Sequence, residues 1–312
     1  MNAVQGQQPP HRPVLYQETI QYLTAKQARR FLDCTAGAGG HSEGLLLHSS
    51  PQTELIALDL DPTAIALTEE RLRPFGRRAR VIQASFLNAS DILQKEGWDG
   101  VDGIVMDLGV SSMQLDQAER GFSFRFDAPL DMRFDPNKGQ SAADLVNTLD
   151  EASLSQIIWE YGEEKHARRI AKAIMQARPL YTTFQLAEIV RKAAGKSHDK
   201  VDSATRTFQA IRIAVNDELE NIAQAIPSLI RNLKTNGRIA IISFHSLEDR
   251  IVKQVFKRES TDCICPPERL LCDCGHVATI NILTKRPITA SEDELQTNPR
   301  SRSAKLRIAE KR

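Results

Sequence analysis

DCTAGAGGHS, at residues 33–42, is the stretch of sequence that decides the fold. It follows an apolar run and leads into a segment with helical periodicity, and its glycines let the backbone turn tightly and pass close to a ligand. A strand, a glycine-rich turn and a helix in this order are typical of nucleotide-binding α/β proteins. Because serine stands where the GxGxxG fingerprint of dinucleotide sites has its third glycine, the turn favours a ligand other than a pyrophosphate.

Apolar runs alternate with helical patterns along the chain, and the alternation predicts a parallel sheet with crossover helices. The expected strands cover residues 30–34, 55–59, 80–84, 101–107, 238–244, 277–283 and 304–309. Helical periodicity without strand alternation follows the fourth strand, and a pair of helices separated at Pro227 is expected between 216 and 236. We therefore predict an α/β, Rossmann-like fold with a mostly parallel, doubly wound sheet and an inserted helical domain. Its three parts are expected at residues 1–112, 113–212 and 213–312.

Length and charge limit the class of protein. The chain has 312 residues, enough for two domains, and its 41 basic and 40 acidic side chains leave a formal net charge of +1. With so little net charge, a nucleic-acid partner has to be recognised by local basic patches. The first residues lack the regions of a signal peptide, and no run of about 18 apolar residues occurs. We expect a cytoplasmic protein without a membrane partner, and the sequence does not predict an oligomeric state.

Asp59 is a second candidate ligand residue. It closes the second expected strand, where an acidic side chain of this fold accepts hydrogen bonds from both hydroxyls of a ribose. The chain has no GxxxxGK[ST] loop to hold a triphosphate. A nucleoside that carries something other than a phosphate chain fits both observations, and S-adenosylmethionine is such a ligand.

Long motifs continue to the end of the chain in a fixed order. They are HRPVLYQE at 11–18, DLGVSSMQLD at 107–116, GFSFRFDAPLDMRFDP at 121–136, YGEEKHARRIAKAI at 161–174, ATRTFQAIRIAVNDEL at 204–219, SFHSLEDRIVK at 243–253 and NPRSRSAKLRIAEK at 298–311. In this order they resemble the MraW family of methyltransferases over essentially the whole chain. The chain departs from the family pattern at two places. Asp202-Ser203 replaces a His-Pro pair of the family, and Ala128 replaces a glycine.

The resemblance implies a class I methyltransferase domain with a helical insertion and S-adenosylmethionine as the cofactor. It also implies that the substrate is 16S ribosomal RNA in the small ribosomal subunit, and that the product is N4-methylcytidine at position 1402. Carried over position by position, the implied cofactor contacts are Gly39, Gly40, His41, Asp59, Phe86, Asp107 and Gln114. Among them, Phe86 is expected to flank the adenine.

The group that accepts the proton of the attacking amine stays open. N4 methylases of DNA commonly carry Asp/Ser-Pro-Pro-Tyr after the fourth strand, whereas this chain has Asp107-Leu108-Gly109. The candidate catalytic residues are Asp107, Asp131 in the PLDMR motif, and His245 at the end of the fifth expected strand. No cysteine lies in or near the motif that begins with Asp107 or the PLDMR motif that contains Asp131. The covalent thiolate attack that methylation of a pyrimidine ring carbon requires therefore has no evident nucleophile.

The RNA-binding candidates lie in the second half of the insertion, where basic side chains outnumber acidic ones. Four cations have the spacing of one helix face, and we call them the basic face: Lys165, Arg168, Arg169 and Lys172. The opposite, buried face is expected to consist of Ala167, Ile170, Ala171 and Ile174. We expect the basic face to contact phosphates. The alternative is a solvated surface whose charges pair with Glu163 and Glu164.

Four of the five cysteines gather in one segment, as Cys263-Ile-Cys265 and Cys272-Asp-Cys274, with His276 following. These are ligand types that zinc prefers. The C-x-C spacing is tighter than the usual C-x-x-C knuckle, so zinc and reduced thiols are both consistent with the sequence, and we assign no metal ligand. Cys34 is expected to be a small core residue.

Two rival functions remain at this point. An NAD-dependent oxidoreductase would need the third glycine of the fingerprint and a substrate acid–base pair, and the DLGVSS element counts against it. An RNA-binding ribosome-assembly factor with a vestigial methyltransferase fold would share the basic surfaces but would transfer no methyl group.

Overall fold

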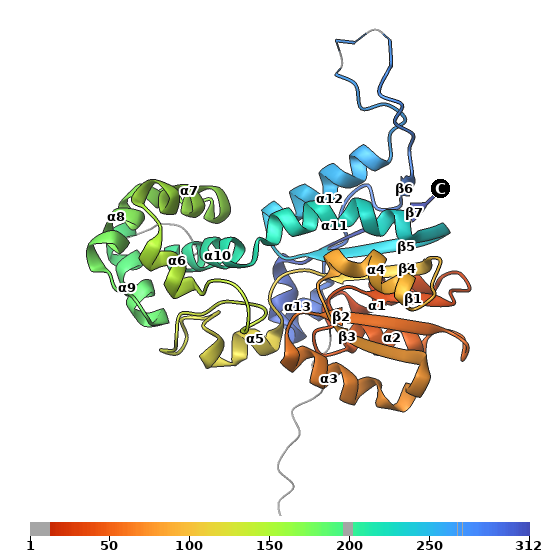
Figure 1. Cartoon of the computed structure of the whole chain (residues 1–312), viewed down its shortest axis with the longest axis horizontal. Helices are drawn as coiled ribbons and strands as arrows, with labels where there is room; N and C mark the ends of the chain where they lie inside the picture. Colours follow the sequence, from red (N-terminus) through yellow and green to blue (C-terminus); the bar gives the residue numbers. More distant parts are fainter. Residues whose placement is uncertain (1–12, 196–201, 267, 270) are drawn as a thin grey trace, which may run out of the picture. The chain divides into compact units, whose positions relative to one another are not determined.

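The computed structural model describes residues 13–195, 202–266, 268–269 and 271–312. Two compact units divide the chain. The first comprises the sequence up to Leu108 together with Ile222–Arg312, and the second comprises Gly109–Asn221. Each unit has a hydrophobic core of its own; Figure 1 shows the first unit in red to orange and in cyan to blue, and the second in yellow to green.

The first unit contains a sheet of seven strands. They are β1 (Arg30–Asp33), β2 (Glu54–Asp59), β3 (Ala79–Gln83), β4 (Val101–Asp107), β5 (Leu233–Ser243), β6 (Ile280–Ile282) and β7 (Lys305–Lys311). Their order is β3-β2-β1-β4-β5-β7-β6; neighbours are parallel from β3 to β5, and β7 runs antiparallel to both β5 and β6. The predicted Rossmann-like, mostly parallel, doubly wound sheet is confirmed, and every predicted strand occurs with somewhat different ends.

Helices cover both faces of the sheet because its strands are apolar on both faces. Along β4, Ile104 and Met106 belong to one core and Val105 to the other, as the two-residue period of a strand requires. The first core is closed by α4 (Ala89–Lys95), α11 (Glu218–Asn232) and α12 (Ser246–Glu259), and the second by α1 (Tyr16–Thr24), α2 (Gly40–Leu47) and α3 (Pro62–Leu72) (Figure 1). Shorter elements of this unit are η1 (Arg73–Arg78), η2 (Phe86–Asn88), α13 (Glu292–Thr297) and η4 (Pro299–Ser303).

Helix α11 corrects the predicted pair of helices. Pro227 lies inside one continuous helix, although a proline in a helix interior removes a hydrogen bond and costs about 3 kcal/mol. Ile222 and Ile226 before the proline, and Leu229 and Ile230 after it, are buried in the same core. Burial of each such side chain contributes about 1.5–3 kcal/mol, so the continuous apolar face offsets the cost of the proline.

The second unit is helical. Its elements are α5 (Ser112–Asp116), η3 (Ala118–Arg120), α6 (Ala142–Thr148), α7 (Glu151–Gly162), α8 (Ala167–Ala177), α9 (Thr183–Ala194) and α10 (Ser203–Asn216). The domain limits that we expect at 112 and 212 stay a prediction; the second of them falls inside α10, and the compact unit extends to Asn221. Within the described residues, every helix is too short or too polar to cross a lipid bilayer.

Candidate functional site

The expected ligand site lies at the carboxyl edge of the sheet. β1 and β4 lie side by side in the sheet. The strand that follows β1 in the chain, β2, pairs on the far side of β1, and the strand that follows β4, β5, pairs on the far side of β4, so the strand order reverses between β1 and β4. Doubly wound sheets bind ligands at such a switch point, outside the carboxyl ends of their strands. Asp33 is the last residue of β1 and Asp107 is the last residue of β4, so both carboxyl groups stand at this edge.

The turn after β1 needs its glycines for two reasons. Gly37 and Gly39 have φ angles of 56° and 74°, in the left-handed region that other residues rarely adopt. At Gly40, an added Cβ would lie 2.3 Å from Pro13 Cγ, so a side chain there would displace the segment before α1. The predicted cofactor contacts Gly39 and Gly40 therefore lie in a tight turn at the beginning of α2.

Asp59, the last residue of β2, is bonded to this turn. Its Oδ2 accepts a hydrogen bond from the Gly37 N–H at 2.8 Å, and its Oδ1 accepts one from the Asp61 N–H at 2.9 Å. Burial raises the pKa of the Asp59 carboxyl, and the backbone donors oppose this rise. A carboxylate offers about four lone-pair sites, so both oxygens can also accept from the hydroxyls of a ribose.

Two further carboxyl groups make this edge acidic. Asp33 is buried, its Oδ2 accepts from the Ser42 hydroxyl at 2.6 Å, and burial raises its pKa to about 6. Burial also raises the pKa of Asp107 to about 8, and repulsion by Asp33 and Glu248 adds to the rise. The Asp107 side chain is 27% exposed, but its Oδ1 is buried without a hydrogen bond from any described residue. Asp33 and Glu248 were not among the predicted site residues, and the position of Asp33 at a strand end was the available signal.

His41 and Phe86 lie in the same unit. His41 is buried in the first turn of α2, with its Nε2 3.7 Å from Asp107 Oδ2. Burial lowers the pKa of His41 to about 4, so the imidazole is neutral at neutral pH and does not balance the acidic groups. Phe86 begins η2 just after β3, half-buried against the core that α4 covers. Both stay predicted cofactor contacts.

Gln114 and Asp131 belong to the second unit. Gln114 is buried, and its Oε1 accepts a hydrogen bond from the Ser111 N–H at 2.9 Å in a capping box that begins α5. Asp131 forms an ion pair with Arg133, its Oδ2 2.6 Å from Nη2. Asp131 also lines a cavity of about 580 Å³, next to the exposed Tyr181. The ion pair occupies a carboxylate that sequence reasoning considered as a proton acceptor.

His245 has a structural role. It is the N-cap of α12, and its Nδ1 accepts a hydrogen bond from the Glu248 N–H at 3.5 Å. In return, Glu248 Oε2 accepts one from the Phe244 N–H at 2.8 Å. This capping box satisfies backbone donors at the helix start, and His245 Nε2 lies 3.1 Å from Glu248 Oε1. His245 stays a candidate catalytic residue.

The basic face is only partly helical. Arg168, Arg169 and Lys172 lie on α8, but Lys165 lies in the turn before it, because Glu163 adopts a left-handed conformation at the end of α7. The single helix face that the spacing predicts is therefore wrong for Lys165. All four side chains are exposed, and the residues expected on the opposite face are buried: Ala167, Ile170, Ala171 and Ile174. Arg169 donates a hydrogen bond to the carbonyl oxygen of Ala193.

Glu164 does not neutralise the basic face. It is buried, and its Oε1 lies 2.9 Å from the His166 backbone nitrogen and 3.0 Å from His166 Nδ1. Among the described residues, no carboxylate forms an ion pair with the remaining cations of the face, Lys165, Arg168 and Lys172. Their charges stay available to a partner.

Trp159 is a candidate that sequence reasoning missed. It lies on α7 and is 59% exposed, and it lines a cavity of about 960 Å³ together with Lys165, Arg168 and Arg169. An exposed aromatic ring beside cations is the combination on which unpaired bases stack. The signal in the sequence was a large aromatic residue outside the buried positions of its helix.

Comparison with known proteins identifies the family. The family model described as the MraW methylase family matches residues 8–312. A ribosomal RNA small subunit methyltransferase H from Dehalococcoides mccartyi is 51% identical over 302 residues, which are 97% of this chain and 86% of the relative. A protein of the same name from Geobacter sp. strain M21 is 50% identical over 306 residues, 96% of this chain and 98% of the relative. A solved rRNA methylase from Streptococcus thermophilus aligns with 95% of this chain and 93% of its own, at 11% identity and a TM-score of 0.42. By the family model and these relatives, the chain belongs to the MraW methylase family.

Proposed function

We propose that this protein is an S-adenosylmethionine-dependent methyltransferase that modifies N4 of cytidine 1402 in 16S ribosomal RNA of the small ribosomal subunit. The observation that carries the proposal is the match, over nearly the whole chain, to relatives named ribosomal RNA small subunit methyltransferase H. The nucleotide and the atom come from the family resemblance of the motifs. A ribosomal substrate agrees with the cytoplasmic location that we expect.

The acidic carboxyl edge of the sheet supports this choice of cofactor. S-adenosylmethionine, when bound, supplies an adenosine and a methyl group on a positively charged sulfur. Asp59 stands where it can accept hydrogen bonds from ribose hydroxyls, and Phe86 follows the next strand, where it can flank the adenine. A positively charged sulfur nearby would favour the ionised forms of Asp33 and Asp107, whereas these ionised forms would repel the pyrophosphate of NAD.

We assign proton acceptance to Asp107. The attacking nitrogen has to lose a proton, and only the ionised form of Asp107 can accept it. Because burial raises the pKa of Asp107 to about 8, that carboxylate is a stronger base than an ordinary aspartate. Its Oδ1 has no hydrogen bond from a described residue, so a lone pair is available. Asp131 and His245 are less suitable acceptors, because the first is paired with Arg133 and the second caps α12.

The second unit supports RNA binding. The basic face offers cations for phosphates, and Trp159 offers a surface on which an unpaired base can stack. A base that is modified has to leave its stack to reach the methyl donor, so single-stranded or opened RNA is the suitable substrate. These features also fit an RNA-binding assembly factor, and the acidic edge with Asp107 is what favours the enzyme.

Cys34 is no substitute for the thiolate that methylation of a ring carbon would need. It is buried directly after β1, and burial raises the pKa of its thiol well above the usual range. A thiol that stays protonated is a poor nucleophile. Transfer to an exocyclic amine needs alignment and a proton acceptor, and alignment alone supplies about 7–11 kcal/mol in well-oriented reactions.

Incubating the protein with labelled S-adenosylmethionine and unmodified small ribosomal subunits tests the proposal. Mass spectrometry of the nucleosides is expected to show N4-methylcytidine, and mapping is expected to locate it at position 1402. A 5-methylcytidine or ribose-methylated product would contradict the assigned atom. A folded protein that binds subunits but transfers no methyl group would favour the assembly factor.

A further inference from the structure

The cysteine loop, residues 260–279 between α12 and β6, contains no helix or strand among its described residues. Figure 1 shows this segment extending away from α12 and the sheet. It lacks apolar support, since Leu271 is 82% exposed and Val277 is 68% exposed. Loops of more than about 12–15 residues without secondary structure are uncommon in compact domains unless they are functional or disordered. The loop therefore needs a stabilising interaction other than a hydrophobic core.

Hydrogen bonds attach the two ends of the loop to each other and to α12. His276 Nε2 lies 2.9 Å from the carbonyl oxygen of Arg258, and the Thr279 N–H donates to the carbonyl oxygen of Glu259 at 2.8 Å. The Ala278 N–H donates to Asp262 Oδ1 at 3.1 Å. His276 is therefore engaged at the base of the loop, and the cysteines lie beyond it.

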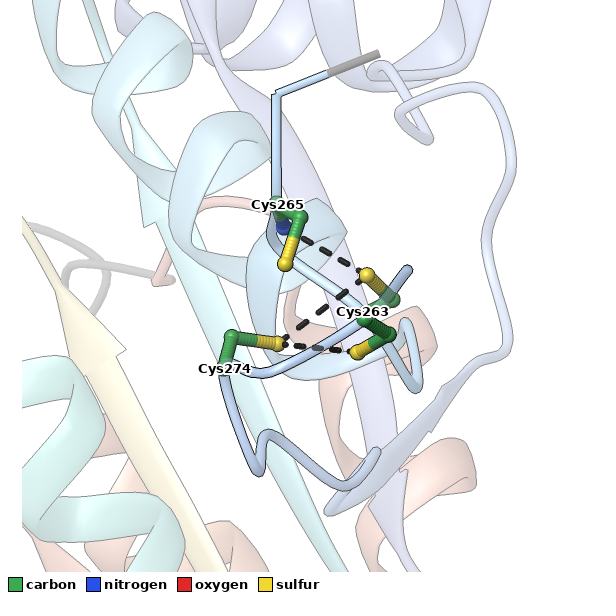
Figure 2. Close-up of side chains that lie close together, drawn as sticks. Cys263, Cys265 and Cys274 are labelled. Carbon is green, nitrogen blue, oxygen red and sulfur yellow. Dashed lines mark hydrogen bonds between the residues drawn. The ribbon is translucent and has the colours of Figure 1, made fainter. Parts of the chain in front are cut away.

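The four sulfur atoms of the loop converge on one point. Those of Cys263, Cys265, Cys272 and Cys274 all lie within 4.8 Å of one another. Cys274 Sγ is 3.5 Å from Cys272 Sγ and 3.9 Å from Cys263 Sγ, and Figure 2 shows the sulfurs of the labelled cysteines turned toward one another. Four thiolates at about 2.3 Å from one zinc ion form a tetrahedron with edges of about 3.8 Å. The separations of Cys274 Sγ from Cys272 Sγ and Cys263 Sγ are close to this edge length.

We propose that the cysteine loop binds one structural Zn²⁺ ion through Cys263, Cys265, Cys272 and Cys274. Four sulfur ligands complete the coordination sphere and leave no position for substrate, which distinguishes a structural from a catalytic zinc site. Backbone donors support the thiolates, because the Ile264 N–H donates to Cys274 Sγ at 3.5 Å and the Cys265 N–H to Cys263 Sγ at 3.4 Å. The four thiols release their protons to solvent on binding, and the metal orders a loop that has no core.

Other uses of the same sulfurs fit less well. Disulfide bonds join sulfurs in pairs about 2.05 Å apart, whereas these four approach a common centre. An iron–sulfur cluster binds its cysteines through different iron atoms and so spreads them farther apart. Cys34 takes no part, because it is buried directly after β1. The zinc site does not depend on the proposed methylation reaction.

The metal content of the full-length protein tests this inference. The protein is produced without a histidine tag, purified under reducing conditions and analysed by inductively coupled plasma mass spectrometry. We expect about one zinc ion per chain in the wild type and in the Cys34→Ala control, and almost none in the Cys272→Ser/Cys274→Ser double variant. Zinc that is missing from the reduced wild type, or retained by the double variant, would overturn the proposal.

A second measurement on the wild type remains decisive if the double variant does not fold. A thiol reagent is added before and after zinc is removed with a chelator. We expect the four loop cysteines to react rapidly after the zinc has been removed, and added Co²⁺ to give the intense absorption of a tetrahedral thiolate site. Equal reactivity in both states, or a Co²⁺ spectrum without thiolate bands, would contradict the site.

Discussion

Replacing Asp107 with asparagine is expected to change how the stability of the protein depends on pH. The pKa of Asp107 is about 8 in the folded protein, against an ordinary value of 3.8. Because the folded-state pKa is the higher one, the folded protein keeps a proton that the unfolded chain has released. This stabilises the fold at low pH, and the contribution is lost as the pH rises through the folded-state pKa. From about pH 6 to about pH 9 the wild type loses roughly 2–3 kcal/mol of unfolding free energy through this group, and Asp107→Asn loses none of it.

Urea unfolding of both proteins at the two pH values, followed by circular dichroism, measures this difference. The unfolding free energy of the variant relative to the wild type is expected to increase by that amount as the pH rises, because titrating groups that do not interact with Asp107 affect both proteins alike. Asp99→Asn is a matched control, since Asp99 is exposed and the Lys234 side chain lowers its pKa, so it does not titrate in this range. If the wild type and Asp107→Asn lose stability in parallel, Asp107 is not protonated in the folded state and the argument from its burial is wrong.

Three further predictions concern binding. Asp59→Ala is expected to weaken S-adenosylmethionine binding by about 1.5–3 kcal/mol for each lost hydrogen bond to the ribose. Calorimetry measures this, and unchanged affinity in a folded variant would remove the ribose assignment. Changing Lys165, Arg168 and Lys172 to glutamate is expected to lower RNA affinity and flatten its salt dependence, because fewer phosphates are neutralised, while cofactor affinity stays the same. Anisotropy titrations over a salt series check it, and normal methylation of subunits would mean that the RNA binds elsewhere. Trp159→Ala is expected to cost about 1–3 kcal/mol of RNA affinity and Trp159→Phe much less, because stacking needs an aromatic face. Equal losses in the two variants would argue against stacking.

The sheet could be predicted because its signals are local. Apolar runs such as Val101–Asp107 define strands, and a glycine-rich turn between strand and helix defines the parallel connection. The continuity of α11 could not be predicted in the same way. The local rule for Pro227 is a broken helix, and the burial that outweighs the rule comes from side chains that meet only in the folded core.

In the candidate site, too, local features could be predicted from the sequence, and features that depend on distant segments could not. The position of Asp59 follows from its spacing after the turn, whereas the raised pKa of Asp107 arises from burial in the folded protein and from Asp33 and Glu248, which approach it from other segments. The place of Lys165 depends on the left-handed residue that ends α7, and helical spacing alone does not reveal such an interruption. The capping box that His245 forms depends on the geometry of α12, which a position at a strand end does not reveal.

The insertion separates β4 from β5 in the chain, although the two strands pair in the sheet. During synthesis, β1 to β4 leave the ribosome before the whole second unit, and β5 emerges after it. Until β5 arrives, β4 presents an unpaired edge, and such an edge can pair with other nascent chains. The second unit has its own core and can fold during this interval. Substitutions that destabilise residues 109–221 are therefore expected to increase aggregation of newly made protein, even where they leave every contact of the finished sheet unchanged.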